Sequence, residues 1–247
     1  MRRLFVVGCS FTKYFWPTWA DIIGKDYDHF ENWGMSGLGN RAISERLTEL
    51  VVRNNITADD TIIVQWSDFH RFDLHSHALF EGWFGGGSVW SYPHFYRTWI
   101  LQHWEEESFM MHSYNVIKSS TALLESLPCK WYMTSMNDLL APLDNFPNLE
   151  PYRSVVTPTE QWFPPMNEYF INGKYPCLSL RSIDKNNGQV VEYTDPHPTP
   201  LPHYDYVMAH MASKLGISPD RQWVVGADAL LDNAIFDTDI PEMFTDY

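Results

Sequence analysis

Near its N-terminus the chain has an uninterrupted apolar run, residues 4–7 (LFVV), followed at once by Gly8, Cys9 and Ser10. An apolar run of this length is typical of a strand buried on both faces, as in the middle of a parallel sheet. Helices must cover both faces of such a sheet, so the chain is constrained to an α/β architecture. The run also carries a serine to the carboxyl end of its strand, where open parallel sheets bind their ligands.

Further strands and helices alternate along the rest of the chain. A β-branched strand is predicted at residues 61–66, a shorter strand at 131–133 and a less certain one at 27–33, and helical spacing occurs at 38–52, 95–127 and 200–215. This alternation predicts an α/β sandwich with a mainly parallel sheet.

The length of 247 residues fits a single domain, because no linker-like stretch divides the chain. Residues from about 137 to 193 are rich in proline, asparagine and aromatic residues without periodicity, and we expect a cap or binding loop there. The C-terminal tail from about residue 217 is acidic and weakly patterned.

Charge and composition exclude several classes of function. The formal net charge is −14, so we expect neither nucleic acid nor an anionic membrane surface as a partner. No stretch approaches the roughly 20 apolar residues that span a bilayer. The apolar run after Arg2 and Arg3 is shorter than the roughly 7–15 residues of a signal-peptide core. The three cysteines lack a CxxC spacing and favour reduced thiols, so we expect a cytoplasmic protein.

A carboxylate and an imidazole lie near the other end of the chain, at Asp195 and His197, just before the last predicted helix. With Ser10 they supply a nucleophile, a base and a group that orients the base, the three parts that acyl transfer requires. A serine after a strand is often only a turn residue, and Asp195 could simply cap a helix. Cys9 is an alternative nucleophile, but its side chain points opposite to that of Ser10, and we expect it to be buried.

Two other polar segments follow predicted strands, at residues 32–37 and at Ser67 and Asp68. The carboxyl ends of parallel strands share one edge of a sheet. We therefore expect both segments to converge on Ser10.

In these blocks the chain resembles the SGNH hydrolase superfamily, the GDSL-type esterases and lipases. The string Gly-Cys-Ser-Phe-Thr at residues 8–12 is similar to the first block of that superfamily, residues 32–37 to the second, and residues 195–198 to the last. The resemblance implies a flavodoxin-like three-layer α/β/α sandwich and a Ser-His-Asp triad formed by Ser10, His197 and Asp195. His203 stands where many members have a further histidine.

The resemblance is greatest to SGNH-like proteins of phages and environmental bacteria, which share the Gly-Cys-Ser-Phe-Thr string. It extends to Asn32, Gly37, Asn40, Arg41, Ile43, Trp66, Ser67 and Arg71. Among these we expect Trp66, Arg71 and Asn32 to bind substrate.

The resemblance also implies an oxyanion hole, formed by the backbone N–H groups of Ser10 and Gly37. The third block of the superfamily adds an asparagine side chain, where this chain has Ser67 at the end of Gln-Trp-Ser. We expect a side chain from Ser67 or Asn40 to take that place. Two further departures are Cys9 in place of the common aspartate and an Asp-x-His spacing instead of Asp-x-x-His.

A second histidine cluster, at His70, Asp73, His75 and His77, raises the alternative of a zinc site. A third ligand at suitable spacing is not evident, so we expect no metal and no cofactor. The function predicted is hydrolysis of a carboxylic ester with a small acyl group, on a small molecule or a saccharide. The saccharide is suggested by the tryptophans at 16, 19, 83, 90 and 162, which fall in loop-like segments. An O-acyltransferase and a non-catalytic glycan-binding or virion module remain alternatives.

Overall fold

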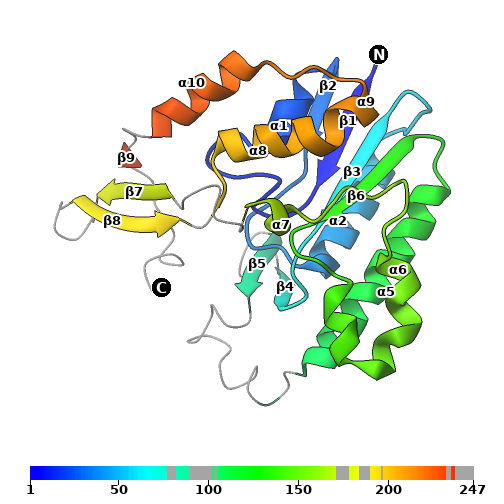
Figure 1. Ribbon diagram of the computed structural model, residues 1–247. Helices are drawn as coiled ribbons and strands as arrows, with labels where there is room; N and C mark the ends of the chain where they lie inside the picture. The colour runs from blue at the N-terminus through cyan, green and yellow to red at the C-terminus, as the bar shows by residue number, and fades with distance from the viewer. Residues whose placement is uncertain are drawn as a thin grey trace.

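The computed structural model describes residues 1–76, 82–88, 102, 105–170, 178–183, 190–195, 197–231 and 235–236 (Figure 1). The start of the helix expected from residue 95, His77, and residues 232–234 and 237–247 of the acidic tail lie outside these residues. No helix in the described part of the chain is both long and apolar enough to cross a bilayer.

The centre of the fold is a four-stranded sheet of order β2-β1-β3-β6 in which every neighbouring pair is parallel. Its strands are β1 (Arg3–Val7), β2 (His29–Asn32), β3 (Thr61–Trp66) and β6 (Lys130–Ser135). All six residues of β3 and the last four of β1 are buried, as their apolar sequences predict. The strand order is that of the flavodoxin-like fold, which confirms the predicted architecture.

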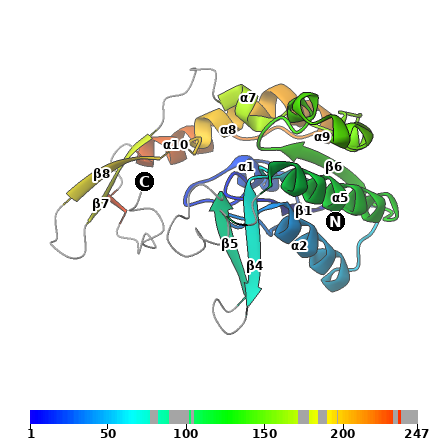
Figure 2. The same cartoon turned by 90° about the horizontal axis from the view of Figure 1, so that it is seen from below.

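Helices cover both faces of this sheet (Figure 2). On one face α1 (Trp19–Gly24) packs against α8 (Pro200–Tyr206), and on the other α2 (Asn40–Arg53) packs against α5 (Glu106–Glu125). The smaller helical elements are η1 (Ala141–Asn145), η2 (Pro147–Tyr152), α6 (Arg153–Val156), α7 (Met166–Phe170), η3 (Val207–Met211), α9 (Ala212–Leu215) and α10 (Arg221–Leu231).

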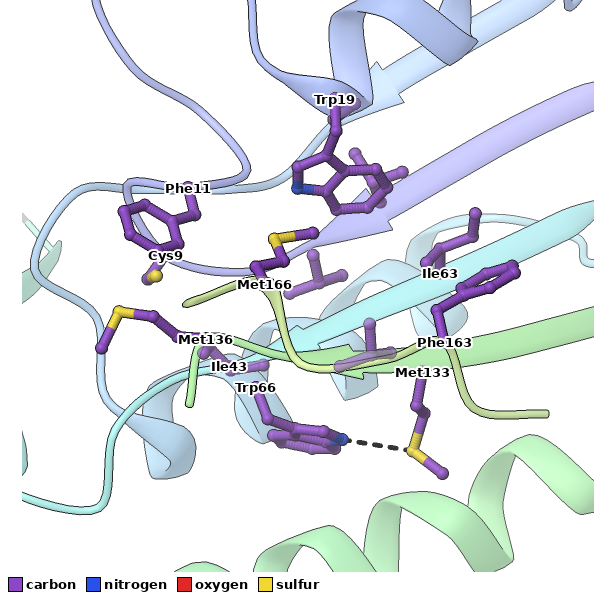
Figure 3. Close-up of a cluster of buried hydrophobic side chains, with 14 of the residues drawn as sticks. Cys9, Phe11, Trp19, Ile43, Ile63, Trp66, Met133, Met136, Phe163 and Met166 are labelled. Carbon is purple, nitrogen blue, oxygen red and sulfur yellow. Dashed lines mark hydrogen bonds between the residues drawn. The ribbon is translucent and has the colours of Figure 1, made fainter. Parts of the chain in front are cut away.

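The core lies on both sides of β3 and β6. In Figure 3, Trp19, Phe163 and Met166 lie on one side of these strands, while Trp66 and Met133 lie on the other, toward α5. All five side chains are at most 3 % exposed. Two tryptophans are thus part of the hydrophobic core, where burial of their large rings stabilises the fold.

The first half of the predicted cap belongs to this core. Seven side chains between residues 137 and 170 are buried, those of Leu139, Leu143, Leu149, Val156, Phe163, Met166 and Phe170. Residues 161–163 also extend the sheet, because Met133 donates its N–H to the Gln161 carbonyl (2.8 Å) and accepts from Phe163 (2.8 Å).

Two small sheets lie outside the main one. β4 (Arg71–Ser76) and β5 (Gly82–Ser88) form an antiparallel hairpin in a stretch that we had expected to be a loop. β7 (Leu178–Ile183) pairs with β8 (Val190–Asp195) and with β9 (Ile235–Phe236). The last residue of β8 is Asp195, so this second sheet delivers the carboxylate toward Ser10.

Candidate active site

Ser10 lies in a tight loop directly after β1, and this loop is held by Gln65 of the neighbouring strand β3. The Gln65 side-chain oxygen accepts hydrogen bonds from the backbone N–H of Cys9 and the hydroxyl of Thr12, each at 3.1 Å. A Cβ atom at Gly8 would lie 2.1 Å from the Thr12 hydroxyl oxygen, so only glycine fits there. These contacts fix the loop and leave Ser10 only 3 % exposed.

The structure brings Ser10, His197 and Asp195 into one chain of hydrogen bonds, although 187 residues separate the first two. The Ser10 Oγ atom lies 2.8 Å from His197 Nε2. On the far side of the imidazole, His197 Nδ1 lies 2.7 Å from Asp195 Oδ1. This is the geometry in which an imidazole can take the hydroxyl proton while a carboxylate orients the ring.

Asp195 is held as an anion at the buried end of this chain. Burial alone would raise its pKa, but hydrogen bonds and charge attraction from His197, with a hydrogen bond from Tyr14, hold the pKa below its usual value. The backbone N–H of His197 also donates to Asp195 Oδ1 (2.8 Å), so one oxygen accepts from both the backbone and the ring of the same histidine. A charged Asp195 stabilises the tautomer of His197 that presents a bare Nε2 to Ser10.

The second predicted oxyanion donor, Gly37, lies in the loop between β2 and α2. Its φ of 77° is in the left-handed region that favours glycine. The same loop is tied to the nucleophile loop, because Met35 donates its N–H to the Gly8 carbonyl (3.1 Å). On its other side the Gly37 carbonyl accepts from the N–H of Gly87 in β5 (3.0 Å).

Asn40 and Ser67 clamp this loop to the end of β3. The Asn40 side-chain oxygen accepts the Ser67 N–H (2.7 Å), and its amide nitrogen donates to the Ser67 carbonyl (3.1 Å). The Ser67 hydroxyl is completely buried and has no hydrogen-bond partner among the described residues. Both candidate side-chain donors therefore sit at this edge of the sheet, and the Asn40 amide already carries two backbone hydrogen bonds.

Asp73 of β4 caps the N-terminus of α2 from outside the helix. Its carboxylate accepts from the N–H of Gly39 (2.6 Å) and from that of Ala42 (3.0 Å). The N-cap residue Gly39 has no side chain that could cap the helix. Burial raises the pKa of Asp73, and the two N–H donors oppose that rise. The hairpin thus fixes the start of α2, immediately after the Gly37 loop.

We expect Asp73→Asn to lower the free energy of unfolding by about 1–2 kcal/mol, since an amide cannot accept at both positions. Urea denaturation followed by tryptophan fluorescence measures the change. Asp59→Asn is the matched control, because Asp59 is exposed and the same charge is removed. Equal stability of the two variants would contradict the capping role.

The three residues predicted to bind substrate have different environments. Trp66 is completely buried between the sheet and α5, and its Nε1 donates to the Met133 sulfur (3.2 Å; Figure 3), so the prediction that it binds substrate is wrong. Alternation along β3 points this side chain into the core. Asn32 supports the nucleophile loop, donating to the Thr12 carbonyl (2.8 Å). Arg71 is half-buried and donates to the Leu38 carbonyl (3.3 Å).

Several other expectations can be compared with the structure. Cys9 is completely buried with its sulfur 3.1 Å from Gln65 Oε1, as expected of a residue that points away from Ser10. Trp16 and Trp19 are buried rather than presented to a sugar. Among the described residues, no three histidine, cysteine or acidic side chains are placed to hold a metal ion.

Gln65, Asp73 and Tyr14 hold the site together, but the sequence analysis gave no role to Gln65 or Tyr14 and considered Asp73 only as a metal ligand. The role of Gln65 could have been found from the sequence, because an amide side chain within a buried β-branched strand needs hydrogen-bond partners. The roles of Asp73 and Tyr14 had no local signal in the sequence, since their hydrogen-bond partners are 31 and 181 residues away, respectively.

Comparisons with known proteins add the following. No protein-family model and no curated protein matches the chain. Among solved structures, it is similar to the Bacillus subtilis protein YXIM, with a TM-score of 0.33 and 13 % identity over 54 % of this chain and 32 % of that one. It is also similar to a member of the lipolytic protein G-D-S-L family from Veillonella parvula, with a TM-score of 0.33 and 14 % identity over 63 % of this chain and 68 % of that one. The chain thus spans about a third of the length of the first of these proteins.

Proposed function

We propose that the protein hydrolyses carboxylic esters through a covalent acyl-enzyme on Ser10. The observation that carries the proposal is the chain of hydrogen bonds from Ser10 through His197 to Asp195, at 2.8 and 2.7 Å. The motifs shared with the SGNH hydrolases, in the same order along the chain, also support it.

The steps follow from this geometry. His197 takes the proton from Ser10 as the hydroxyl oxygen attacks the ester carbonyl, and Asp195 stabilises the imidazolium that forms. The backbone N–H groups of Ser10 and Gly37 donate to the oxyanion of the tetrahedral intermediate. His197 then gives its proton to the leaving alcohol. Water deprotonated by His197 attacks the acyl-enzyme and releases the acid.

We infer that the acyl group is small. The Ser10 side chain is 3 % exposed, and the edge of the Phe11 ring packs against the His197 ring at a centroid distance of 5.6 Å. A long acyl chain would need an open apolar channel beside the nucleophile. The close packing around Ser10 in the described part of the chain instead favours a small acyl group, such as acetyl on a small alcohol or a saccharide.

Intact-protein mass spectrometry after incubation with a fluorophosphonate tests the proposal without knowledge of the natural substrate. We expect one adduct per chain in the wild type, because the probe phosphonylates Ser10 with loss of fluoride. Ser10→Ala should remain unlabelled under the same conditions.

Cys9→Ser is the second variant in this experiment, because Cys9 is the neighbouring alternative nucleophile. This variant should still be labelled on Ser10. Labelling that survives Ser10→Ala but is lost in Cys9→Ser would move the nucleophile to the thiol. A folded wild type without an adduct would exclude the hydrolase and favour the binding module.

A further inference from the structure

The segment that carries His197 is not anchored in the main sheet. Asp195 ends β8, which belongs to the sheet β8-β7-β9, whereas Ser10 follows β1 of the four-stranded sheet. Backbone pairing between the two sheets therefore does not set the distance from Ser10 to His197. A catalytic hydrogen bond needs that distance held within a fraction of an ångström, so side chains must hold the two loops together.

Tyr14 makes two contacts across this junction. Its hydroxyl donates to Asp195 Oδ2 at 2.6 Å, the carboxylate oxygen that His197 does not use. Its ring stacks on the His197 imidazole with a centroid distance of 4.0 Å and an interplanar angle of 22°. Tyr14 comes only four residues after Ser10, so the nucleophile loop itself carries this contact to the acid and the base.

Trp16 makes a third contact, on the other side of His197. Its Nε1 donates to the Pro198 carbonyl at 2.7 Å, and the indole is 4 % exposed. Its ring packs edge-on against Tyr14, with centroids 4.6 Å apart. Asp195 and Pro198 flank His197 in the chain, so the two aromatic residues hold the histidine segment at both ends.

We propose that Tyr14 is a positioning residue that locks the Asp195 carboxylate and the His197 ring against Ser10, with Trp16 as its support. With Oδ1 bound by His197 and Oδ2 by Tyr14, the carboxylate cannot rotate away from the imidazole. The face of the tyrosine ring also attracts the imidazolium that forms after proton transfer. The proposal deepens the proposed function and rests on it for its kinetic test alone.

The groups that face His197 set the expected direction of the effect. They are Ser10, Asp195, Tyr14, the edge of Phe11 and His203, which burial keeps neutral. The Tyr14 hydroxyl holds the second oxygen of the Asp195 carboxylate, so its removal should free the carboxylate to rotate away from the imidazole and lower the rate of proton transfer from Ser10.

The kinetic test measures the rate of fluorophosphonate labelling for the wild type and Tyr14→Phe, which keeps the ring and loses the hydroxyl. We expect the rate to fall by about tenfold, because a mobile carboxylate misaligns the base.

Tyr114→Phe is the matched control. The Tyr114 hydroxyl is buried and donates to the Leu139 carbonyl (2.9 Å) on the α5 side of the sheet. This variant should lose stability yet keep the labelling rate of the wild type. A Tyr14→Phe variant that behaves like Tyr114→Phe would overturn the positioning role.

The proton on His197 Nδ1, which lies in the hydrogen bond to Asp195 Oδ1, provides a second readout by NMR that needs no catalysis, with His197→Gln to assign the signal. We expect Tyr14→Phe to broaden or abolish this signal, because the carboxylate is then free to rotate. If labelling succeeds and Tyr14→Phe leaves both the rate and the signal unchanged, the role of Tyr14 is excluded and the hydrolase stands. If the wild type is never labelled but Tyr14→Phe loses the signal, the hydrolase is excluded and the positioning role stands.

Discussion

Replacing His197 by alanine is expected to lower ester turnover by about 10⁵–10⁶-fold while the protein remains folded. Without the imidazole, no base among the described residues lies within hydrogen-bond reach of the Ser10 hydroxyl to take its proton. Ser10→Ala should cost about as much, and the double variant no more, because the two residues act as one unit. Hydrolysis of a chromogenic acetyl ester under saturating substrate, with circular dichroism to confirm the fold, measures the loss.

The chain offers a close control for this variant in His70. Asp68 and His70 repeat the local geometry of Asp195 and His197, with the histidine N–H and Nδ1 both at 2.7 Å from one carboxylate oxygen. The Nε2 atom of His70 faces Glu106 at 3.5 Å rather than a serine. His70→Ala should therefore keep most of the turnover. A large loss of turnover in His70→Ala with little loss in His197→Ala would show that the base is His70 and not His197.

The hydrogen-bonded arrangement of Ser10, His197 and Asp195 could be predicted because each residue has a local signal in the sequence. An apolar strand ends at Gly8, so Ser10 falls at the carboxyl edge, where parallel sheets bind ligands. Asp195 and His197 come just before a helix that begins with a proline. The alternation of strands and helices then predicts the sandwich, and the resemblance to the SGNH hydrolases implies its flavodoxin-like arrangement.

The supports of the site could not be predicted, because they are contacts between segments far apart in the chain. The hairpin formed by β4 and β5 has three consecutive glycines in its second strand, a composition that favours turns and weakens the signal for a strand. This hairpin contacts the Gly37 loop, because the N–H of Gly87 donates to the Gly37 carbonyl (3.0 Å). Capping of α2 by Asp73 is then a consequence of tertiary structure, which no local pattern encodes.

The prediction for Trp66 failed for a related reason. A tryptophan at the end of a strand, beside the candidate site, is compatible with either a binding surface or the core. Alternation along β3 decides between them, since Gln65 points to the nucleophile loop and Trp66 must point to the opposite face. The helices α2 and α5 cover that face, and their presence is what buries the ring.

Acidification is expected to destabilise the protein through His203, well above the pH at which its carboxylates titrate. His203 is 1 % exposed, its ring lies between the edges of Phe11 and Phe170, and its Nδ1 has no partner among the described residues. Burial lowers its pKa from 6.5 to about 3, and the charge of His197 adds to this effect. Below pH 6.5 His203 is protonated in the unfolded chain but stays neutral in the folded protein. The free energy of unfolding therefore falls as the pH falls.

The slope of this fall is about 1.4 kcal/mol per pH unit, which amounts to roughly 3 kcal/mol between pH 6.5 and pH 4. Urea denaturation at half-unit pH steps measures it, and His203→Leu should flatten the curve because leucine fits the apolar site and does not titrate. His210→Leu is the control: burial also lowers the His210 pKa, but the ring is partly exposed, so its removal should change the slope less. A wild-type curve that is flat down to pH 4 would mean that His203 is protonated inside the fold.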